Sequence, residues 1–257
     1  MALSRRSLLY CLPLVLAGPA GPAGAQPAPV QIYAAMTFRP ALERVLAAYR
    51  ETGGNAVAVY GPTPVLIRQL AGGAPADILL TADPDWMDAA VRQALVQPDT
   101  RAELLANDLV LAGAAGAEAV GTITRTFALD ALLNGGRLAM CDPEHDPAGK
   151  YARQSLQALG FWDAVQPHVA IAESAPAAVV LVDRGEARAA VCFKTDLHGD
   201  EHAVLVGTFP ADSHAPIVYP VALARAPRSP GATEALAFLR GAEALRIFTG
   251  FGYRPPG

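Results

Sequence analysis

Residues 30–54 read VQIYAAMTFRPALERVLAAYRETGG, and this stretch decides the fold class. Its first six residues form an almost unbroken apolar run, which predicts a buried strand. Apolar residues then recur at the spacing of one helix face, at Leu42, Val45, Leu46 and Tyr49. Gly53-Gly54 is typical of a helix end. A buried strand followed directly by an amphipathic helix is the building unit of an α/β sheet.

The same unit recurs along the rest of the chain. Strand-like apolar runs lie at residues 56–60, 78–81, 109–112, 137–141, 169–172, 189–193, 203–206 and 218–224. Helical patterns lie at residues 65–71, 86–94, 129–133, 152–159, 175–184, 233–240 and 242–248. Continuous apolar strands that alternate with helices predict a parallel sheet covered on both faces. The two similar halves predict two lobes, with a ligand between them at the carboxyl ends of the strands.

Composition sets the broad class of the protein. The chain has 257 residues, of which 52% are hydrophobic and 17% charged, so it can bury a full core and is not intrinsically disordered. Its net charge of -4 argues against nucleic acid as a partner, because nucleic-acid-binding proteins carry a basic surplus. The length allows one large domain or two small lobes.

Residues 1–25 have the features of a secretory signal. Arg5 and Arg6 precede an apolar run from Leu8 to Ala17, and Ala23-Gly24-Ala25 fits a small-residue cleavage site. The apolar run is too short to cross a bilayer core of about 30 Å. Residues 4–9 also resemble a twin-arginine signal, so export by the Sec or the twin-arginine route stays open. We expect a periplasmic protein with this signal removed.

Four helix starts carry the features of an anion site. Thr63 precedes Pro64 as a hydroxyl N-cap, and Thr37 precedes a helix with Pro40 in its first turn. Pro147 precedes Ala148, and Ser174 precedes Ala175 and Pro176. Each start offers free backbone N–H groups and the positive end of a helix dipole, which bind anions without a charged side chain. Ordinary capping is the preferred explanation for any one of these starts, because hydroxyl residues and prolines mark most helix starts. The four starts meet at one cleft only in a two-lobed fold.

Longer motifs resemble a known family. They include AGGAPADI at residues 71–78, LLNGGRLA at 132–139, DPEHDPAG at 142–149, FPADSH at 209–214 and YPVA at 219–222. In this order they resemble the periplasmic molybdate-binding proteins of ABC importers, and residues 142–149 are the most specific. The resemblance implies a type II periplasmic binding protein, with two Rossmann-like lobes joined by two crossover strands. We expect one lobe from residues 26–109 and 220–257, and the other from residues 110–219.

The resemblance also implies a ligand site built from neutral donors around a tetrahedral oxyanion. Thr37 and Thr63 stand where the family has serines, and Ala148 and Ala175 stand where it uses backbone N–H groups. Phe193 stands where the family has a tyrosine hydroxyl, so one donor is lost. Loss of a donor to an anion costs about 1.5–3 kcal/mol, or roughly ten- to a hundredfold in affinity. Molybdenum would enter only as molybdate bound through Thr37, Thr63, Ala148 and Ala175.

These features together predict a binding protein and not an enzyme. We expect a monomer without a cofactor that captures molybdate, and tungstate as well, and delivers it to an ABC permease in the inner membrane. A different anion, such as a small carboxylate or another oxyanion, is the alternative, because Arg39 and Lys194 stand beside the site positions and can add contacts.

An exported enzyme is a third and weaker interpretation. It would use His145, His198 or His202. The run Glu144-His145-Asp146 lacks the spacing of helical metal ligands and predicts a polar loop, and Gly199 between the other two histidines also predicts a loop. Cys141 and Cys192 lie in apolar runs, which favours buried thiols on strands, although an exported protein can also form a disulfide.

Overall fold

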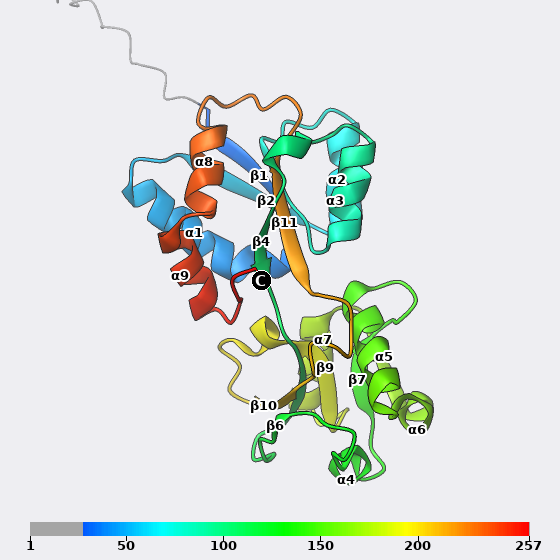
Figure 1. Cartoon of the computed structure of the whole chain (residues 1–257). Coiled ribbons are helices and arrows are strands. Elements are labelled where there is room, and N and C mark those ends of the chain that lie inside the picture. Colours follow the sequence, from blue (N-terminus) through cyan, green and yellow to red (C-terminus); the bar gives the residue numbers. More distant parts are fainter. Residues whose placement is uncertain (1–27, 257) are drawn as a thin grey trace, which may run out of the picture.

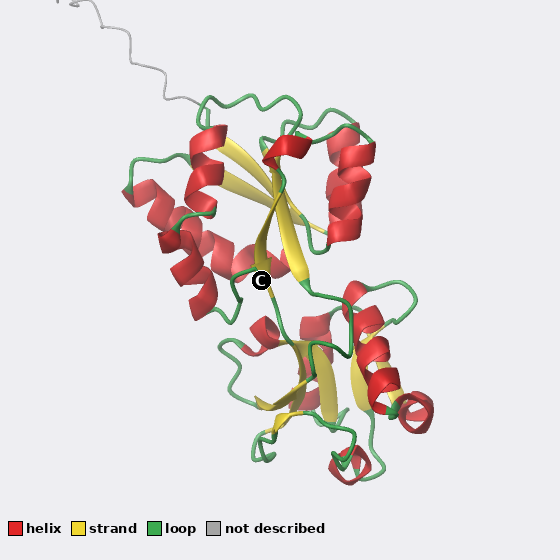
Figure 2. Ribbon diagram, viewed as in Figure 1, coloured by secondary structure: helices red, strands yellow, loops and turns green. Residues whose placement is uncertain are grey.

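The computed structural model describes residues 28–256, so the expected signal segment lies outside it. The chain forms two lobes, each built around one sheet, with a narrow junction between them (Figures 1 and 2). This arrangement confirms the two-lobed α/β fold predicted from the sequence. No helix among the described residues is long and apolar enough to cross a membrane.

The first lobe contains a five-stranded sheet in the order β2-β1-β3-β11-β4. Its strands are β1 (Val30–Ala35), β2 (Ala56–Gly61), β3 (Ile78–Leu80), β4 (Ala102–Ala106) and β11 (Val218–Leu223). Helices α1 (Arg39–Glu51), α8 (Ala232–Leu239) and α9 (Ala242–Gly250) cover one face, and α2 (Thr63–Ala71) and α3 (Pro84–Arg92) cover the other (Figure 1). Alternation along β1 explains this layering, because Ile32 packs with the α1 side and Tyr33 with the α2 side.

The second lobe contains a six-stranded sheet in the order β6-β10-β5-β9-β7-β8. Its strands are β5 (Leu109–Ala114), β6 (Gly121–Thr122), β7 (Leu138–Cys141), β8 (Val169–Ala172), β9 (Ala189–Phe193) and β10 (Ala203–Thr208). Helices α4 (Leu129–Leu133), α5 (Pro147–Leu159) and α6 (Trp162–Val165) pack on one face, and α7 (Ala175–Asp183) packs on the other. Short 3-10 helices include η1 (Met36–Phe38) and η4 (Lys194–Leu197).

The chain crosses between the lobes twice, after β4 and again before β11. The side chain of Asn107 is buried at the first crossing and donates hydrogen bonds to the Tyr219 hydroxyl, 2.9 Å away, and the Thr195 hydroxyl, 3.0 Å away. Asp108 beside it pairs with Arg254, 2.6 Å between Oδ1 and Nε. Polar contacts among residues distant in sequence therefore fix the junction from which both sheets extend.

The structure corrects three expectations from the sequence. Both sheets are mixed, because β11 runs antiparallel to β3 and β4, and β5 runs antiparallel to β9 and β10. These are the strands on either side of a crossing, where the chain enters a sheet from the other lobe. Strands β4 and β6 were missed. Helix α2 begins at Thr63 with Pro62 as its N-cap, so Thr63 is not the cap residue.

Candidate functional site

A cavity of about 220 Å³ lies between the lobes. From the first lobe it is lined by Met36, Thr37, Ala82 and Tyr219. From the second lobe it is lined by the first residues of α5 and α7, together with Phe193 and Asp196. Six segments that are far apart in sequence therefore meet where the carboxyl ends of strands face the amino ends of helices, as predicted for a ligand site.

The structure brings four of the five predicted site residues to this cavity. Thr37, Ala148, Ala175 and Phe193 line it. Thr63 is buried behind the wall, and its hydroxyl oxygen lies 3.4 Å from the backbone nitrogen of Ala82, which does line the cavity. Thr63 is therefore placed one residue away from the space that a ligand would fill.

The start of α7 leaves one backbone donor available to the cavity. Ser174 is the N-cap, and its hydroxyl accepts from the N–H of Ala177 at 3.3 Å. Ala178 donates to the carbonyl of Ser174, and Pro176 has no N–H. Among the described residues, no acceptor takes the N–H of Ala175, which also carries the positive end of the helix dipole.

The start of α5 is occupied by its own capping side chain. Asp146 is the N-cap, and its Oδ1 accepts from the N–H of Ala148 at 2.8 Å and of Gly149 at 3.4 Å. Lys150 donates to the carbonyl of Asp146, and Pro147 has no N–H. Asp146 ends the polar loop predicted from the sequence, and its capping contact was not predicted. An aspartate immediately before Pro147 at a helix start was the signal that could have found it.

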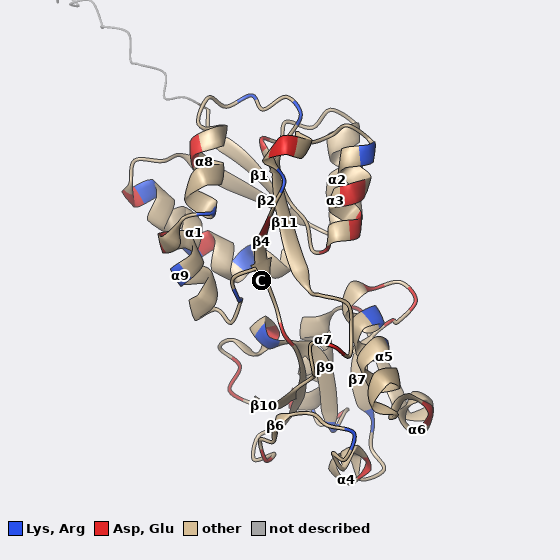
Figure 3. Ribbon diagram, in the orientation of Figure 1, with Lys and Arg blue, Asp and Glu red and all other residues tan. Residues whose placement is uncertain are grey.

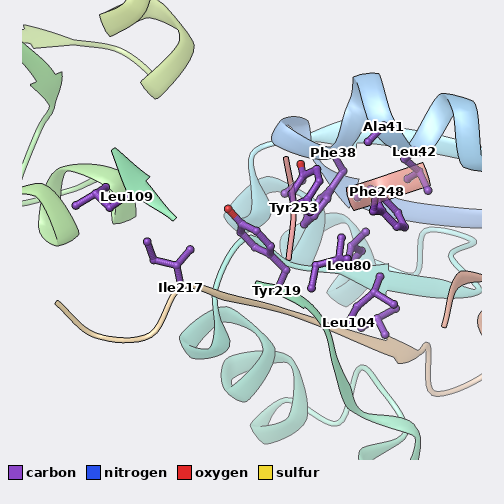
Figure 4. Packing of buried hydrophobic residues seen from close by; sticks show 14 of the residues in the cluster. Phe38, Ala41, Leu42, Leu80, Leu104, Leu109, Ile217, Tyr219, Phe248 and Tyr253 are labelled. Carbon is purple, nitrogen blue, oxygen red and sulfur yellow. The ribbon is translucent and has the colours of Figure 1, made fainter. Parts of the chain in front are cut away.

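Tyr219 brings a hydroxyl that the sequence analysis also missed. The ring is buried, packs edge-on against Phe38 at 5.0 Å between centroids, and contacts Tyr253 at 5.7 Å (Figure 4). Because its oxygen accepts the hydrogen bond from Asn107, its own proton remains available for an acceptor in the cavity. The Tyr253 hydroxyl donates to the carbonyl of Thr37 at 2.9 Å, which anchors the backbone of this second hydroxyl residue from the first lobe.

A second acidic side chain lies in the cavity wall. Asp196 is held by the backbone N–H of Phe193, 2.8 Å from Oδ2. Burial raises the pKa of the Asp196 carboxyl to about 7, against the lowering effect of the Phe193 hydrogen bond, and the nearby Asp146 raises it further. A fraction of Asp196 is therefore neutral at physiological pH, unlike an exposed aspartate.

The predicted basic contacts lie elsewhere. The Arg39 guanidinium is over the Tyr60 ring at 5.8 Å, and Lys194 Nζ is 3.8 Å from Asp108 Oδ2. Neither side chain lines the cavity, so the structure gives no support to the prediction that they contact a bound anion. Figure 3 shows the Lys and Arg residues of the described chain scattered over both lobes.

Among the described residues, the histidines considered from the sequence are exposed or packed on aromatic rings, and the two cysteines are buried. His145 is exposed and pairs with Asp142, and His198 packs against the Phe251 ring at 4.3 Å. Residues 28–256 contain no group of three His, Cys, Asp or Glu side chains that could hold a metal ion. Cys141 and Cys192 are free and buried on β7 and β9, as the buried-thiol interpretation predicted. Burial raises the pKa of both thiols, so neither has the thiolate character of a nucleophile.

A larger groove of about 370 Å³ lies between α3 and α5. Its walls include Asp83, Asp85 and Glu103, opposed by Lys150. None of the five predicted site residues lines this groove. The smaller cavity is therefore the better candidate for a small polar ligand.

A comparison with protein families decides the class. The family model described as a bacterial extracellular solute-binding protein matches residues 30–254. The chain belongs to this family. The match spans both lobes and every residue that lines the interlobe cavity.

Individual relatives of this solute-binding protein cover nearly its whole length. It is 37% identical over 236 residues to the molybdate-binding protein ModA of Escherichia coli, covering 91% of this chain and 92% of the relative. It is 32% identical to the ModA of Haemophilus influenzae, covering 88% and 90%. The solved periplasmic molybdate-binding protein of Azotobacter vinelandii is 22% identical and superposes with a TM-score of 0.72 over 89% of this chain and all of its own, which shows the shared fold.

Proposed function

We propose that this solute-binding protein captures molybdate in the interlobe cavity and delivers it to the permease of an ABC importer. The observation that carries the proposal is the cavity wall, which contains the hydroxyl residues Thr37 and Tyr219 from one lobe and Ala175, with its unpartnered N–H, from the other. Two relatives named for molybdate binding, similar over about nine-tenths of the chain, support the same ligand.

The chemistry of the ligand fits a site made of donors. Molybdate is a fully deprotonated dianion, so each of its oxygens accepts hydrogen bonds. It carries no proton and therefore needs no acceptor in the site. Tungstate has the same charge and nearly the same size, and we expect it to bind alike. Sulfate is smaller, so donors placed for molybdate oxygens would stand too far from its own. Charge-assisted hydrogen bonds weaken with such lengthening, which makes cavity size the basis of selection.

The remaining features of the proposal follow from this role. We infer a periplasmic monomer, exported by the signal in residues 1–25, which binds its ligand without a cofactor and catalyses no reaction. We also infer a division into one lobe of residues 26–109 and 220–257 and another of residues 110–219. The crossings that lead into β5 at Leu109 and into β11 at Val218 support these boundaries to within two residues, with Leu109 in the second sheet and Tyr219 in the first.

One observation favours a different anion as the second candidate. Asp146 and Asp196 both line the cavity, and a carboxylate accepts hydrogen bonds from a ligand that carries a proton. Hydrogen phosphate or a small carboxylic acid would satisfy such an acceptor, whereas molybdate has no proton to give. This candidate differs from the first in requiring an acidic group in the site.

Calorimetric titration distinguishes the two. The exported protein, expressed from the full chain, is unfolded and refolded to remove bound solute and titrated with molybdate, tungstate, sulfate, phosphate and small carboxylates. Tight one-to-one binding of molybdate and tungstate alone is the expected result. If molybdate and tungstate give no heat of binding but phosphate or a carboxylate does, the proposed ligand is wrong. The assignment to the solute-binding proteins would remain.

A further inference from the structure

The first turns of α5 and α7 face one cavity but differ in one respect. Both begin with a capping residue, and both carry a proline in the first turn, which removes one N–H. At α7 the Ser174 hydroxyl bonds to Ala177 and leaves the N–H of Ala175 without a partner among the described residues. At α5 the proline is the first residue, and the Asp146 side chain takes the N–H of the second residue, Ala148, at 2.8 Å.

The contact at α5 is an anion bound to an anion site. A carboxylate oxygen at a helix N-terminus accepts charge-assisted hydrogen bonds and meets the positive end of the helix dipole. These are the same two interactions that would hold an oxyanion there. Asp146 lines the cavity itself, so its carboxylate occupies part of the space and the donors that a ligand would use.

We propose that Asp146 is a built-in competitor that sets the affinity and selectivity of the cavity, because its carboxylate holds the Ala148 N–H that an oxyanion must take over. This inference rests on the proposed function. A ligand gains the α5 donors only by displacing the Asp146 side chain, and it meets that negative charge while doing so. Since Asp146 is tethered beside its donors, a weakly accepting anion cannot displace it, whereas a dianion with four strong acceptor oxygens can.

The surroundings of Asp146 strengthen the competition. The wall holds a second acidic side chain, Asp196, and of the described residues that line the cavity none is basic. An incoming anion therefore finds no side-chain cation to offset the carboxylate of Asp146. The charge of Asp146 repels every anion at close range. Binding is therefore favourable only for a ligand that accepts hydrogen bonds from most of the donors in the cavity at once.

Two substitutions of Asp146 distinguish the effect of its charge from the effect of its whole side chain. Asp146→Asn keeps the shape and the capping oxygen but removes the charge, and asparagine caps helices as well as aspartate does. Asp146→Gly removes the side chain at little cost to the helix, because glycine is also accepted at an N-cap and residue 146 is extended. Asp142→Asn is the matched control, because it removes a carboxylate from the same loop outside the cavity wall.

The experiment is calorimetric titration of each exported protein with molybdate and with sulfate, after thermal melting has shown that each variant folds. We expect molybdate affinity to rise by about ten- to a hundredfold in Asp146→Gly and by less in Asp146→Asn, with sulfate binding gained or strengthened in both. Asp142→Asn should match the parent protein.

The pattern of results distinguishes this inference from the proposed function. Molybdate binding in the parent that is unchanged or weaker in both Asp146 variants overturns the inference and leaves the proposed function in place. Binding absent from the parent but present in Asp146→Gly supports the inference in its strongest form. Molybdate binding absent from parent and variants alike overturns both.

Discussion

At the scale of single residues, a substitution at Phe193 can test whether the cavity lacks a hydrogen-bond donor. Its ring lines the cavity and meets Tyr151 edge-on at 6.5 Å between centroids. Phe193→Tyr adds one hydroxyl, and we expect molybdate affinity to rise by about tenfold, the value of one added hydrogen bond to a charged acceptor. Calorimetry measures the change, and Phe161→Tyr, on the far part of the same lobe, serves as control. Equal affinity would show that Tyr219 already fills the missing role.

Asp196 gives the protein a pH dependence with a defined sign. Its carboxyl has a pKa of about 7 in the folded chain against the usual 3.8, because burial disfavours the charge. Between these values the unfolded chain has lost a proton that the folded chain keeps, so the free energy of unfolding falls as pH rises. The fall amounts to at most about 4 kcal/mol and is complete above about pH 7.

The matching variant is Asp196→Asn, which keeps an acceptor for the Phe193 N–H and cannot ionise. Denaturant unfolding at about pH 5 and about pH 8 should show a smaller loss of stability in the variant than in the parent. The exposed Asp212→Asn should behave like the parent. If the free energy of unfolding of Asp196→Asn falls between the two pH values as much as that of the parent, other groups cause the pH dependence.

Some site residues could be predicted from the sequence and others could not, for reasons that concern single residues. Local signatures of helix starts marked Thr37, Ala148 and Ala175 as candidates, and the family resemblance gave them their ligand roles. Tyr219 was missed because its role depends on Asn107, which is 112 positions away and orients its hydroxyl. Asp146 was recognisable only as a capping residue, and its competition with a ligand became visible when α5 and α7 were seen to face the same cavity.

At the scale of elements, local pattern predicted strands and helices well and sheet direction poorly. β1 and β9 begin and end where the apolar runs do. β4 was missed because Glu103 lies inside it and the polar run Asp99-Thr100-Arg101 precedes it, which interrupts the apolar signal. The antiparallel direction of β5 and β11 was missed because it follows from the crossings between lobes, which no local window contains.

Gly149 makes the close packing of α5 on β7 possible. A Cβ at this position would lie 2.3 Å from the carbonyl oxygen of Asp142 and 2.6 Å from that of Cys141, and neither backbone atom can move easily. We expect Gly149→Ala to lower the free energy of unfolding by about 1–3 kcal/mol, as overpacking does. Gly250→Ala is the matched control, because its Cβ would meet no atom within 4 Å and the helix would gain up to about 1 kcal/mol. Denaturant unfolding measures both, and a neutral Gly149→Ala would contradict the packing argument.

At the scale of the whole molecule, the cavity has walls from both lobes, so a bound oxyanion would tie the lobes together. The second lobe contributes the N–H of Ala175, and Ala175→Pro removes that donor and puts the proline ring carbon in place of its hydrogen. Proline suits the first position of a helix, and the preceding Ser174 is already extended, at φ -160° and ψ 161°, as proline requires. The variant should therefore fold normally and still present the Thr37 and Tyr219 hydroxyls of the first lobe.

If the ligand bridges the lobes, Ala175→Pro should lose about ten- to a hundredfold in molybdate affinity. We also expect molybdate to reduce the radius of gyration of the parent protein, as measured by small-angle X-ray scattering. At a molybdate concentration below the dissociation constant of the variant, Ala175→Pro should show no such reduction. Ala242→Pro is the matched control, since Ala242 opens α9 after the extended Gly241 and lies outside the cavity wall. Full affinity in Ala175→Pro would mean that the first lobe holds the ligand without this donor, and closure would then require other contacts from the second lobe.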